Sequence, residues 1–284
     1  MSPLGSLQQY RICVWGALPC RFHLLRTINV LAQAYITPTR YPRTPAPVLA
    51  SAWRRPALVR HIVALGTDVV CLQEVEVETF AAVQQALGPL GYTGHFAKKG
   101  EGKPDGCATF VRQSTLAWGT VHSLMYTDGS DPERDSGHLA LVVLCEYKGR
   151  PLGLVNTHLQ WAPPGTPPDR QRGYRQIRQL LQERGHIAPG CEAWLICGDL
   201  NVTPESHVVA VLRAGGFDYT HRTLAGTYTC NANARAHMID YVFYTEAFRV
   251  QPVAVPIIED QTPLPSYDQP SDHLALMAYF EWAL

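Results

Sequence analysis

The sequence lacks several features that would assign it to a class of protein at once. None of its eight cysteines forms a C-x-x-C pair, no apolar run approaches the length of a membrane span, and 24 lysines and arginines balance 24 aspartates and glutamates. A disulfide framework needs regularly spaced cysteines, and a transmembrane helix needs about 20 apolar residues. A net charge of zero provides no overall positive field that would attract nucleic acid, although a local basic patch is still possible.

The cysteines instead lie mostly in apolar, strand-like runs, which is typical of small buried side chains in a reducing compartment. We therefore expect a cytoplasmic protein without a membrane span, and we expect it to be a monomer. Residues 12–20 are mildly apolar after Arg11 and faintly resemble a signal peptide, but Gly16 and Pro19 interrupt them. Residues 1–20 are predicted to be an N-terminal extension, either poorly ordered or adding a strand, and residues 21–284 to be one domain.

The patterns along the chain alternate between strands and helices. Apolar runs such as His138 to Tyr147 and Pro151 to His158 follow one another as hairpins, while residues 52–65 and 169–184 have helical periodicity. Purely parallel βαβ winding does not place so many strands back to back. No internal repeat, low-complexity tract or linker divides the sequence. These features predict one α/β domain with mixed sheets covered by helices.

The stretch from Trp194 to Pro204 combines a buried strand with polar residues at its end. Four apolar residues lead to Gly198, and Asp199 and Asn201 follow two positions apart. If the strand geometry continues, both side chains point to the same side of the sheet. A carboxylate that can act as a base and an amide that can donate and accept are suited to catalysis. The alternative is a turn that caps the strand through the aspartate side chain.

Other polar residues also stand at the ends of apolar runs. Each one alone has an ordinary structural explanation, such as a turn, a solvated strand end or a salt bridge. Taken together, carboxylates, amides and imidazoles at strand ends predict a site for a hard cation with oxygen ligands, Mg²⁺ or Mn²⁺. The residues concerned are Asn29, Glu74, His158, Asp199, Asn201, Asp240, Asp272 and His273.

The motifs that contain these residues resemble those of the endonuclease/exonuclease/phosphatase superfamily, to which pancreatic deoxyribonuclease belongs. The resemblance runs from about residue 22 to the C-terminus, and each motif is short, but their order and spacing agree with the family. The matching motifs are Leu72-Gln73-Glu74, Asn156-Thr157-His158-Leu159, Gly198-Asp199-Leu200-Asn201, Ile239-Asp240-Tyr241 and Ser271-Asp272-His273.

A narrower resemblance points to the deadenylase branch, which includes nocturnin and the angel proteins. The segments that carry it are Asn29-Val30-Leu31-Ala32, Trp53-Arg54-Arg55-Pro56, Asp105-Gly106-Cys107-Ala108 and Asn156-Thr157-His158-Leu159-Gln160-Trp161. This resemblance implies a four-layer α/β sandwich, with two packed mixed β-sheets between layers of helices.

The resemblance also implies roles for the metal-site residues. Glu74 is expected to hold the divalent metal directly, with Asn29 beside it. Asp272 is expected to be a ligand or to support one. Asp199 is expected to orient or deprotonate the attacking water, and Asn201 to fix the water or the phosphate.

For the histidines, the resemblance implies that His158 donates to a non-bridging phosphate oxygen and that His273 also contacts the phosphate. A neighbouring carboxylate raises the affinity of an imidazole for its proton, so Asp240 is expected to hold the His273 ring and keep it protonated. Metal and imidazolium together would stabilise the charge that develops during in-line attack on a phosphodiester.

The expected reaction is hydrolysis of phosphoester bonds in RNA or at an RNA 3′ end. The lysines Lys98, Lys99 and Lys103 and the arginine-bearing segment 169–184 are basic groups that can follow a phosphate backbone. We expect Asn156, Trp161 and Lys103 to contact the substrate, with Trp161 offering a surface for base stacking.

Two alternatives accompany this prediction. Deadenylases usually carry an aromatic stacking residue shortly before the Asp-Tyr pair, but residues 229–237 contain none. This departure and the neutral net charge favour a phosphatase of a small phosphorylated metabolite or a phospholipid head group. The other alternative is a non-catalytic binding module, which the full set of polar residues argues against.

Overall fold

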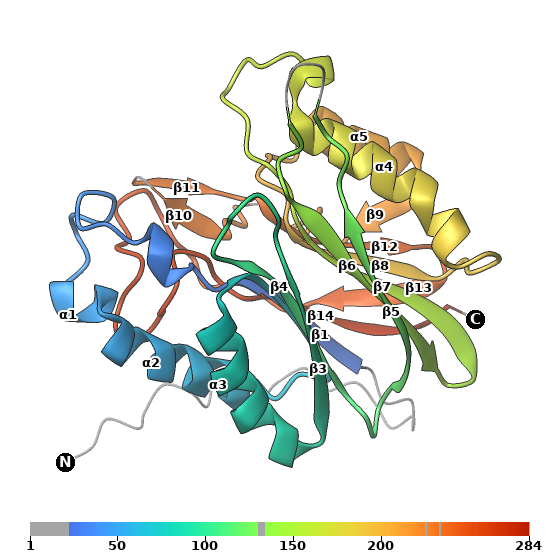
Figure 1. Cartoon of the computed structure of the whole chain (residues 1–284), viewed down its shortest axis with the longest axis horizontal. Coiled ribbons are helices and arrows are strands. Elements are labelled where there is room, and N and C mark those ends of the chain that lie inside the picture. Colours follow the sequence, from blue (N-terminus) through green and yellow to red (C-terminus); the bar gives the residue numbers. More distant parts are fainter. Residues whose placement is uncertain (1–22, 130–133, 225, 233, 284) are drawn as a thin grey trace.

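Two six-stranded sheets lie face to face, and helices cover the outer face of each sheet (Figure 1). This computed structural model describes residues 23–129, 134–224, 226–232 and 234–283, so the prediction for residues 1–20 lies outside the described part. The arrangement confirms the predicted four-layer α/β sandwich with mixed sheets.

The first sheet is organised around one parallel pair of strands. Strands β1 and β2 are parallel, with Leu25 opposite Val69, and helix α2 connects them. The remaining pairings in this sheet are antiparallel. In spatial order the strands are β13 (Phe248–Pro252), β14 (Leu276–Trp282), β1 (His23–Asn29), β2 (Val69–Val75), β4 (Gly106–Arg112) and β3 (Tyr92–Lys98).

The second sheet repeats this plan. Strands β7 and β8 are its parallel pair, with Gly153 opposite Trp194, and helix α4 connects them. The other pairings are antiparallel. In spatial order the strands are β5 (Ala117–Met125), β6 (Leu139–Tyr147), β7 (Arg150–His158), β8 (Trp194–Asp199), β12 (Asp240–Thr245) and β9 (Phe217–Tyr219).

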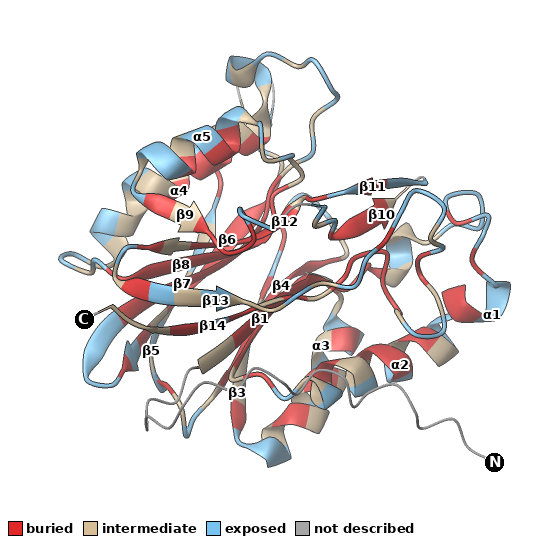
Figure 2. Cartoon of the chain, turned by 180° about the vertical axis from the view of Figure 1, so that it is seen from behind, coloured by how far each residue is buried: buried red, intermediate tan, exposed pale blue. Residues whose placement is uncertain are grey.

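Three apolar layers hold the sandwich together, and Figure 2 shows the buried residues concentrated along the sheets and the inner faces of the helices. Side chains such as Cys71 and Val143 fill the space between the sheets. Leu58 of α2 packs against Ile28 on the outer face of the first sheet. Ile177 of α4 packs against Ile196 on the outer face of the second. Burial of these apolar surfaces stabilises the stack of layers.

The helices end close to the residues that the sequence indicates. Helix α4 differs because the expected start at residue 169 is occupied by a 3-10 turn, Pro168–Arg170, which follows Pro167. None of the helices in the described ranges is long and apolar enough to cross a membrane. The helical elements are α1 (Ala46–Leu49), α2 (Ser51–Ala64), α3 (Val77–Leu87), α4 (Arg172–Ile187) and α5 (His207–Ala214), with further 3-10 turns at Gln33–Tyr35 and Gly88–Leu90.

A short hairpin of β10 (Cys230–Ala232) and β11 (Arg235–His237) lies apart from the two sheets. Cys230 forms an isolated bridge with His273, which anchors the hairpin beside the segment that leads into β14. The apolar run that follows His273 becomes a strand, β14, only at Leu276. Residues 271–273 form a turn instead, in which the backbone N–H of His273 donates to Ser271 Oγ at 3.2 Å.

Candidate active site

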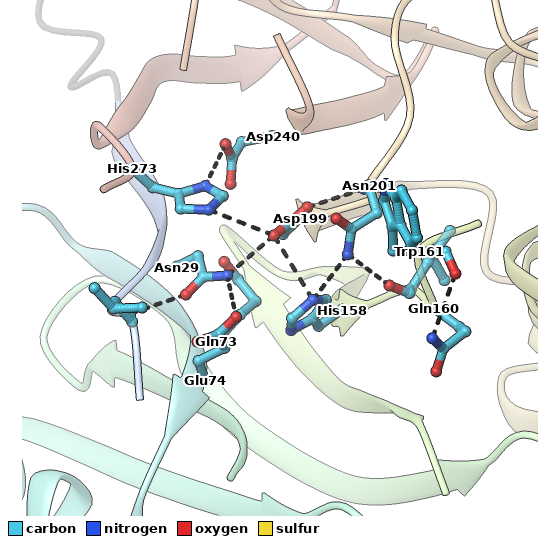
Figure 3. Close-up of polar contacts among 12 residues, drawn as sticks. Asn29, Gln73, Glu74, His158, Gln160, Trp161, Asp199, Asn201, Asp240 and His273 are labelled. Carbon is cyan, nitrogen blue, oxygen red and sulfur yellow. Dashed lines mark hydrogen bonds and ion pairs between the residues drawn. The ribbon is translucent and has the colours of Figure 1, made fainter. Parts of the chain in front are cut away.

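Polar side chains from both sheets meet at one end of the sandwich. Asn29 ends β1, His158 ends β7 and Asp199 ends β8, whereas Glu74 lies near the end of β2 and Asp240 begins β12. The parallel pairs β1–β2 and β7–β8 bring these strand ends to one edge, and β12 runs antiparallel to β8 with Asp240 opposite Asp199. Figure 3 shows the side chains pointing toward one another.

Two of the site residues adopt a backbone conformation that is uncommon outside glycine. The φ angles of Glu74 and Asn201 are 56° and 55°. Non-glycine residues remain in the left-handed region when their surroundings hold them there, often at functional sites. At Glu74, the pairing of β2 with β4 shifts register between Leu72 and Val75, and this bulge re-aims the glutamate side chain.

The turn after β8 uses one oxygen of Asp199 and leaves the other for the site. Asn201 donates its backbone N–H to Asp199 Oδ1 at 2.9 Å, which is the side-chain turn that the sequence offered as the alternative interpretation. Asp199 Oδ2 instead accepts from Asn29 Nδ2 at 3.0 Å. Asp199 therefore closes the turn with one carboxylate oxygen and presents the other to the site.

Asn29 holds the two carboxylates of the site together. Its Nδ2 donates to Glu74 Oε1 and to Asp199 Oδ2, both at 3.0 Å, while its Oδ1 accepts the backbone N–H of Leu31 at 2.9 Å. The amide oxygen thus accepts one backbone hydrogen bond and keeps a second lone pair. This geometry makes Asn29 a donor that positions Glu74 and Asp199, and its predicted place beside the metal stays a prediction.

Asp199 is electrostatically poised to gain or lose a proton near neutral pH. Burial raises its pKa to about 7; the charge of His273 opposes this shift, and that of Asp240 adds to it. A carboxylate whose pKa lies near the working pH can accept a proton efficiently and release it again. Such a group is suited to act on the water that attacks a phosphate.

His273 is held in its charged form by a buried carboxylate. Its Nδ1 lies 2.9 Å from Asp240 Oδ2, and its Nε2 lies 3.7 Å from Asp199 Oδ2. Burial alone would lower the pKa of the imidazole, but the charge of Asp240, with Cys230 and the hydrogen bond, raises that pKa well above its usual value. The contact between Asp240 and His273 is the one predicted.

His158, unlike His273, is held in its neutral form by its surroundings. Its Nε2 lies 3.7 Å from Asp199 Oδ2 and 3.0 Å from Asn201 Nδ2, while Lys99 Nζ lies 3.1 Å from its Nδ1. Burial first, and then the positive charge of Lys99, lower its pKa well below the usual histidine value. The site thus contains one neutral and one protonated imidazole, at equal distances from the same oxygen of Asp199.

The carboxylates around Glu74 fit a hard divalent cation. Glu74 Oε2 accepts the backbone N–H of Ala32 at 2.9 Å, and burial together with the nearby charge of Asp272 raises the pKa of Glu74. Asp240 Oδ1 is buried without a hydrogen-bond partner among the described residues. An excess of buried carboxylates is what a bound Mg²⁺ or Mn²⁺ would neutralise. Among the described residues, Asp199, Asp240 and His273 form one group whose ligand atoms lie close enough to share an ion, and Asp272 belongs to another with Cys230 and His273. Glu74 and Asp272 stay the predicted ligands.

The structure does not support a substrate contact for Asn156. Its side chain is 0% exposed and faces the space between the sheets. Its Nδ2 donates to the carbonyls of Leu72 and Ala108 at 3.1 and 2.9 Å, and its Oδ1 accepts from Gln73 at 2.7 Å. The prediction is wrong because Asn156 shares the face of His158 but lies two positions deeper in β7, where the opposite sheet covers its side chain.

Trp161 and Lys103 line one groove next to the site. The groove has a volume of about 560 Å³, and its other lining residues include Gln160, Arg170 and Arg172. Trp161 is 55% exposed, and Figure 3 shows it on the same side of the site as Asn201. A local concentration of positive charge therefore exists although the whole chain is neutral.

A short chain of contacts connects this groove to His158. Ser136 lines the groove, and its Oγ lies 2.9 Å from His138 Nδ1. The rings of His138 and His158 are 5.8 Å apart in an edge-to-face arrangement. The charge of Lys103 also contributes to the lowered pKa of His158.

Several residues of the site were not assigned there from the sequence. Tyr41, in the proline-rich loop, donates to Asp272 Oδ2 at 2.9 Å. Lys99 was expected to follow a phosphate backbone, but it is buried and paired with Asp105 at 2.7 Å. The motif Asp105-Gly106-Cys107-Ala108 was the available sign for Asp105, but no pattern in the sequence indicates its partner.

Comparison with known proteins gives the family context of this site. Residues 27–273 match the profile of the Endonuclease/Exonuclease/phosphatase family. Nocturnin of Homo sapiens is 28% identical over 292 residues, which cover 89% of this chain and 64% of that protein. The CCR4-Not complex 3'-5'-exoribonuclease subunit Ccr4 of Candida albicans is 26% identical over 319 residues, covering 89% of this chain and 40% of that protein. The chain thus spans less than two thirds of either relative.

Solved structures share the fold. The structure of ANGEL2, a 2',3'-cyclic phosphatase, in complex with adenosine-2',3'-vanadate superposes with a TM-score of 0.80 at 21% identity, covering 93% of this chain and 96% of that chain. The human nocturnin catalytic domain with a bound sulfate anion superposes with a TM-score of 0.73 at 26% identity, covering 92% and 94%.

Proposed function

The chain belongs to the endonuclease/exonuclease/phosphatase family, as its motifs predict, and we propose that it is a divalent-cation-dependent hydrolase of phosphoester bonds at the end of an RNA chain. The observation that carries this proposal is the environment of Asp199 Oδ2. It is hydrogen-bonded to Asn29 and lies 3.7 Å from the Nε2 atoms of both His158 and His273. A carboxylate base thus has two imidazole donors 3.7 Å from one of its oxygens.

Each group has a part in water attack on a phosphoryl centre. Asp199 accepts the proton of the attacking water, since its pKa of about 7 allows it to be ionised at neutral pH. His273, kept protonated by Asp240, stabilises negative charge on the phosphoryl oxygens. His158 adds a neutral donor, and Asn201 offers its amide beside it.

The cation site of this proposal is formed by Glu74 and Asp272. When bound, Mg²⁺ or Mn²⁺ supplies positive charge that polarises the phosphoryl group and neutralises the oxyanions. The protein contributes the fixed position of Glu74, which Asn29 and the backbone N–H of Ala32 hold through its two carboxylate oxygens. Tyr41 holds Asp272 in a similar way.

RNA is favoured over a small phosphoester by the groove beside the site. An exposed tryptophan and the cationic side chains of Lys103 and Arg170 line the same hollow. Bases stack on aromatic rings, and cations follow the backbone phosphates of single strands. The similarity to Ccr4, an exoribonuclease subunit, and to ANGEL2, a 2',3'-cyclic phosphatase, supports an RNA end as substrate.

The decisive experiment compares three substrates in the presence of Mg²⁺. They are a 5′-labelled oligoadenylate with a free 3′ end, the same oligomer ending in a 2′,3′-cyclic phosphate, and p-nitrophenyl phosphate. We expect shortening from the 3′ end or opening of the cyclic phosphate, and loss of either activity in Asp199→Asn.

Turnover of the aryl phosphate without any change in the RNA would favour the small-molecule phosphatase instead. Failure on all three substrates would favour a non-catalytic module. The cytoplasmic location and the monomeric state remain predictions, which fractionation of cells and light scattering would test. The six cysteines in the described part are free thiols, in keeping with a reducing compartment.

A further inference from the structure

The loop that follows β3 closes on itself and places a lysine inside the site. Lys99 is 5% exposed, and its Nζ lies 2.7 Å from Asp105 Oδ2. The backbone N–H of Lys99 donates to the carbonyl of Asp105 at 2.9 Å, and Tyr35 Oη donates to Asp105 Oδ1 at 2.7 Å. The carboxylate therefore has a donor on each oxygen, the backbone hydrogen bond closes the loop, and together they hold the ammonium in one place.

From that place the ammonium contacts the catalytic ring. Lys99 Nζ lies 3.1 Å from His158 Nδ1. An ammonium group has donors and no acceptor, so Nδ1 must accept. A neutral imidazole that accepts at Nδ1 carries its proton on Nε2, the atom that faces Asp199 and Asn201.

Asn201 competes for the same ring from the other side. Its Nδ2 donates to the carbonyl of Leu159 at 2.9 Å and also lies 3.0 Å from His158 Nε2. A neutral imidazole has only one acceptor nitrogen, so Lys99 and Asn201 cannot both donate to it. The contact from the ammonium is charge-assisted and is the stronger of the two.

We infer that Lys99, anchored by Asp105, is a positioning residue that selects the Nε2–H tautomer of His158. In this tautomer the Nε2–H has no acceptor within hydrogen-bond distance among the described residues and is available to a phosphoryl oxygen. This inference rests on the proposed hydrolysis of phosphoesters and deepens it, since it assigns the source of the neutral donor.

The groups that face His158 agree with this assignment. Burial and the positive charges of Lys99, His273 and Lys103 disfavour a charge on the ring, and the acidic side chain of Asp199 lies 3.7 Å from it. The pKa of His138 is itself lowered to about 2, first by burial and then by Lys99, so this neighbour is neutral. His273 has a carboxylate at the equivalent Nδ1 position, which explains why the two histidines differ in charge.

The test removes the lysine and its anchor together. Lys99→Met alone leaves Asp105 buried and unpaired, which destabilises the fold, so the variant to compare is the double substitution Lys99→Met with Asp105→Asn. Lys148→Met, in the turn between β6 and β7 at the opposite end of the second sheet, is the control for loss of one positive charge.

The first measurement is the tautomer of His158 by two-bond ¹H–¹⁵N correlation in ¹⁵N-histidine protein, with the ring assigned by its absence in His158→Gln. We expect Nε2–H in the wild type and in Lys148→Met. In the double variant Asn201 becomes the donor to Nε2, and we expect the Nδ1–H form. An Nδ1–H or doubly protonated ring in the wild type would overturn the inference, as would an unchanged Nε2–H tautomer in the double variant.

The second measurement is turnover of the RNA substrates. In the double variant we expect kcat to fall about 10- to 100-fold with little change in KM, because the lost donor acts on the transition state. An unchanged kcat would also overturn the inference. If the wild type has the Nε2–H tautomer but hydrolyses no phosphoester, the proposed function fails, whereas the tautomer assignment stands.

Discussion

Gln73 of the first sheet donates its Nε2 to Asn156 Oδ1 of the second sheet at 2.7 Å. This hydrogen bond crosses the apolar interface between the sheets one residue before Glu74 and two residues before His158. Buried polar groups cost free energy unless they are paired. The alignment of the two sheets that keeps this hydrogen bond is therefore favoured over shifted alignments that break it. The pair fixes how far apart Glu74 and His158, the residues that follow it in the two sheets, lie.

Replacing Asn156 by Leu should therefore destabilise the protein. We expect a loss of roughly 2–4 kcal/mol in the free energy of unfolding, because the carbonyls of Leu72 and Ala108 and the amide of Gln73 lose their partner. Urea unfolding measures the change. Gln113→Leu removes an exposed amide and should change the free energy by less than about 0.5 kcal/mol. Equal effects of the two substitutions would contradict the assignment.

Replacing Glu74 by Gln should remove the stabilisation that the cation provides. In the wild type we expect the melting temperature to rise with Mg²⁺ concentration, since a ligand that binds only the folded state stabilises it. Glu74→Gln should show no such rise and should lose activity by at least about 100-fold. Glu78→Gln, in the first turn of α3, is the matched control. An undiminished response to Mg²⁺ in Glu74→Gln would exclude this residue as a ligand.

Replacing Asp199 by Asn should abolish hydrolysis and stabilise the fold at high pH. The pKa of Asp199 is raised to about 7, so above that pH the folded chain contains a buried charge that the unfolded chain exposes to water. We expect a gain of roughly 1–3 kcal/mol at pH 8 that disappears as the pH falls below about 4, where both states bind the proton. Asp218→Asn at the surface is the control. A loss of stability at pH 8 would contradict the prediction.

The pH dependence of kcat/KM should have two limbs. Activity should rise with pH through about 7, where Asp199 loses its proton, and fall at an alkaline pH above the usual histidine range, where His273 loses its own. Asp240→Asn should move the alkaline limb to lower pH because it removes the charge that raises the pKa of His273. The measurement is a rate profile at constant Mg²⁺. A maximum below pH 6 would not fit these assignments.

The groove can be tested separately from the chemistry. Trp161→Ala should raise the KM for an oligoribonucleotide by about 5- to 150-fold, since stacking contributes about 1–3 kcal/mol per base. Lys103→Met should also raise this KM, because it removes a cation that contacts the backbone phosphates. Both variants should leave hydrolysis of a small aryl phosphate unchanged. The controls are Leu90→Ala, an exposed apolar residue next to the start of β3, and Lys148→Met. Equal losses on both substrates would place Trp161 outside the RNA path.

The alternating order of strands and helices and the presence of hairpins predicted one α/β domain with mixed sheets, and the family resemblance of the motifs implied its four layers. Periodicity determines which face of a strand or helix is buried, so these features are local and can be recognised in the sequence. The same logic identified Glu74, His158, Asp199 and His273, since a charged or polar residue after an apolar strand is unusual enough to be noticed.

Which atom each group presents was decided by contacts between distant parts of the chain. Asn29 turns its nitrogen toward two carboxylates because the backbone N–H of Leu31 takes its oxygen, and Asn156 points inward because the opposite sheet supplies its partners. Lys99 reaches His158 only because the loop to Asp105 closes on itself. The sequence by itself determined which polar residues are available and that they stand at the ends of strands. The tertiary structure decided tautomer, charge and direction. Lys99 lies 59 residues from His158, Asp240 lies 33 residues from His273, and Asn29 lies 170 residues from Asp199 along the chain.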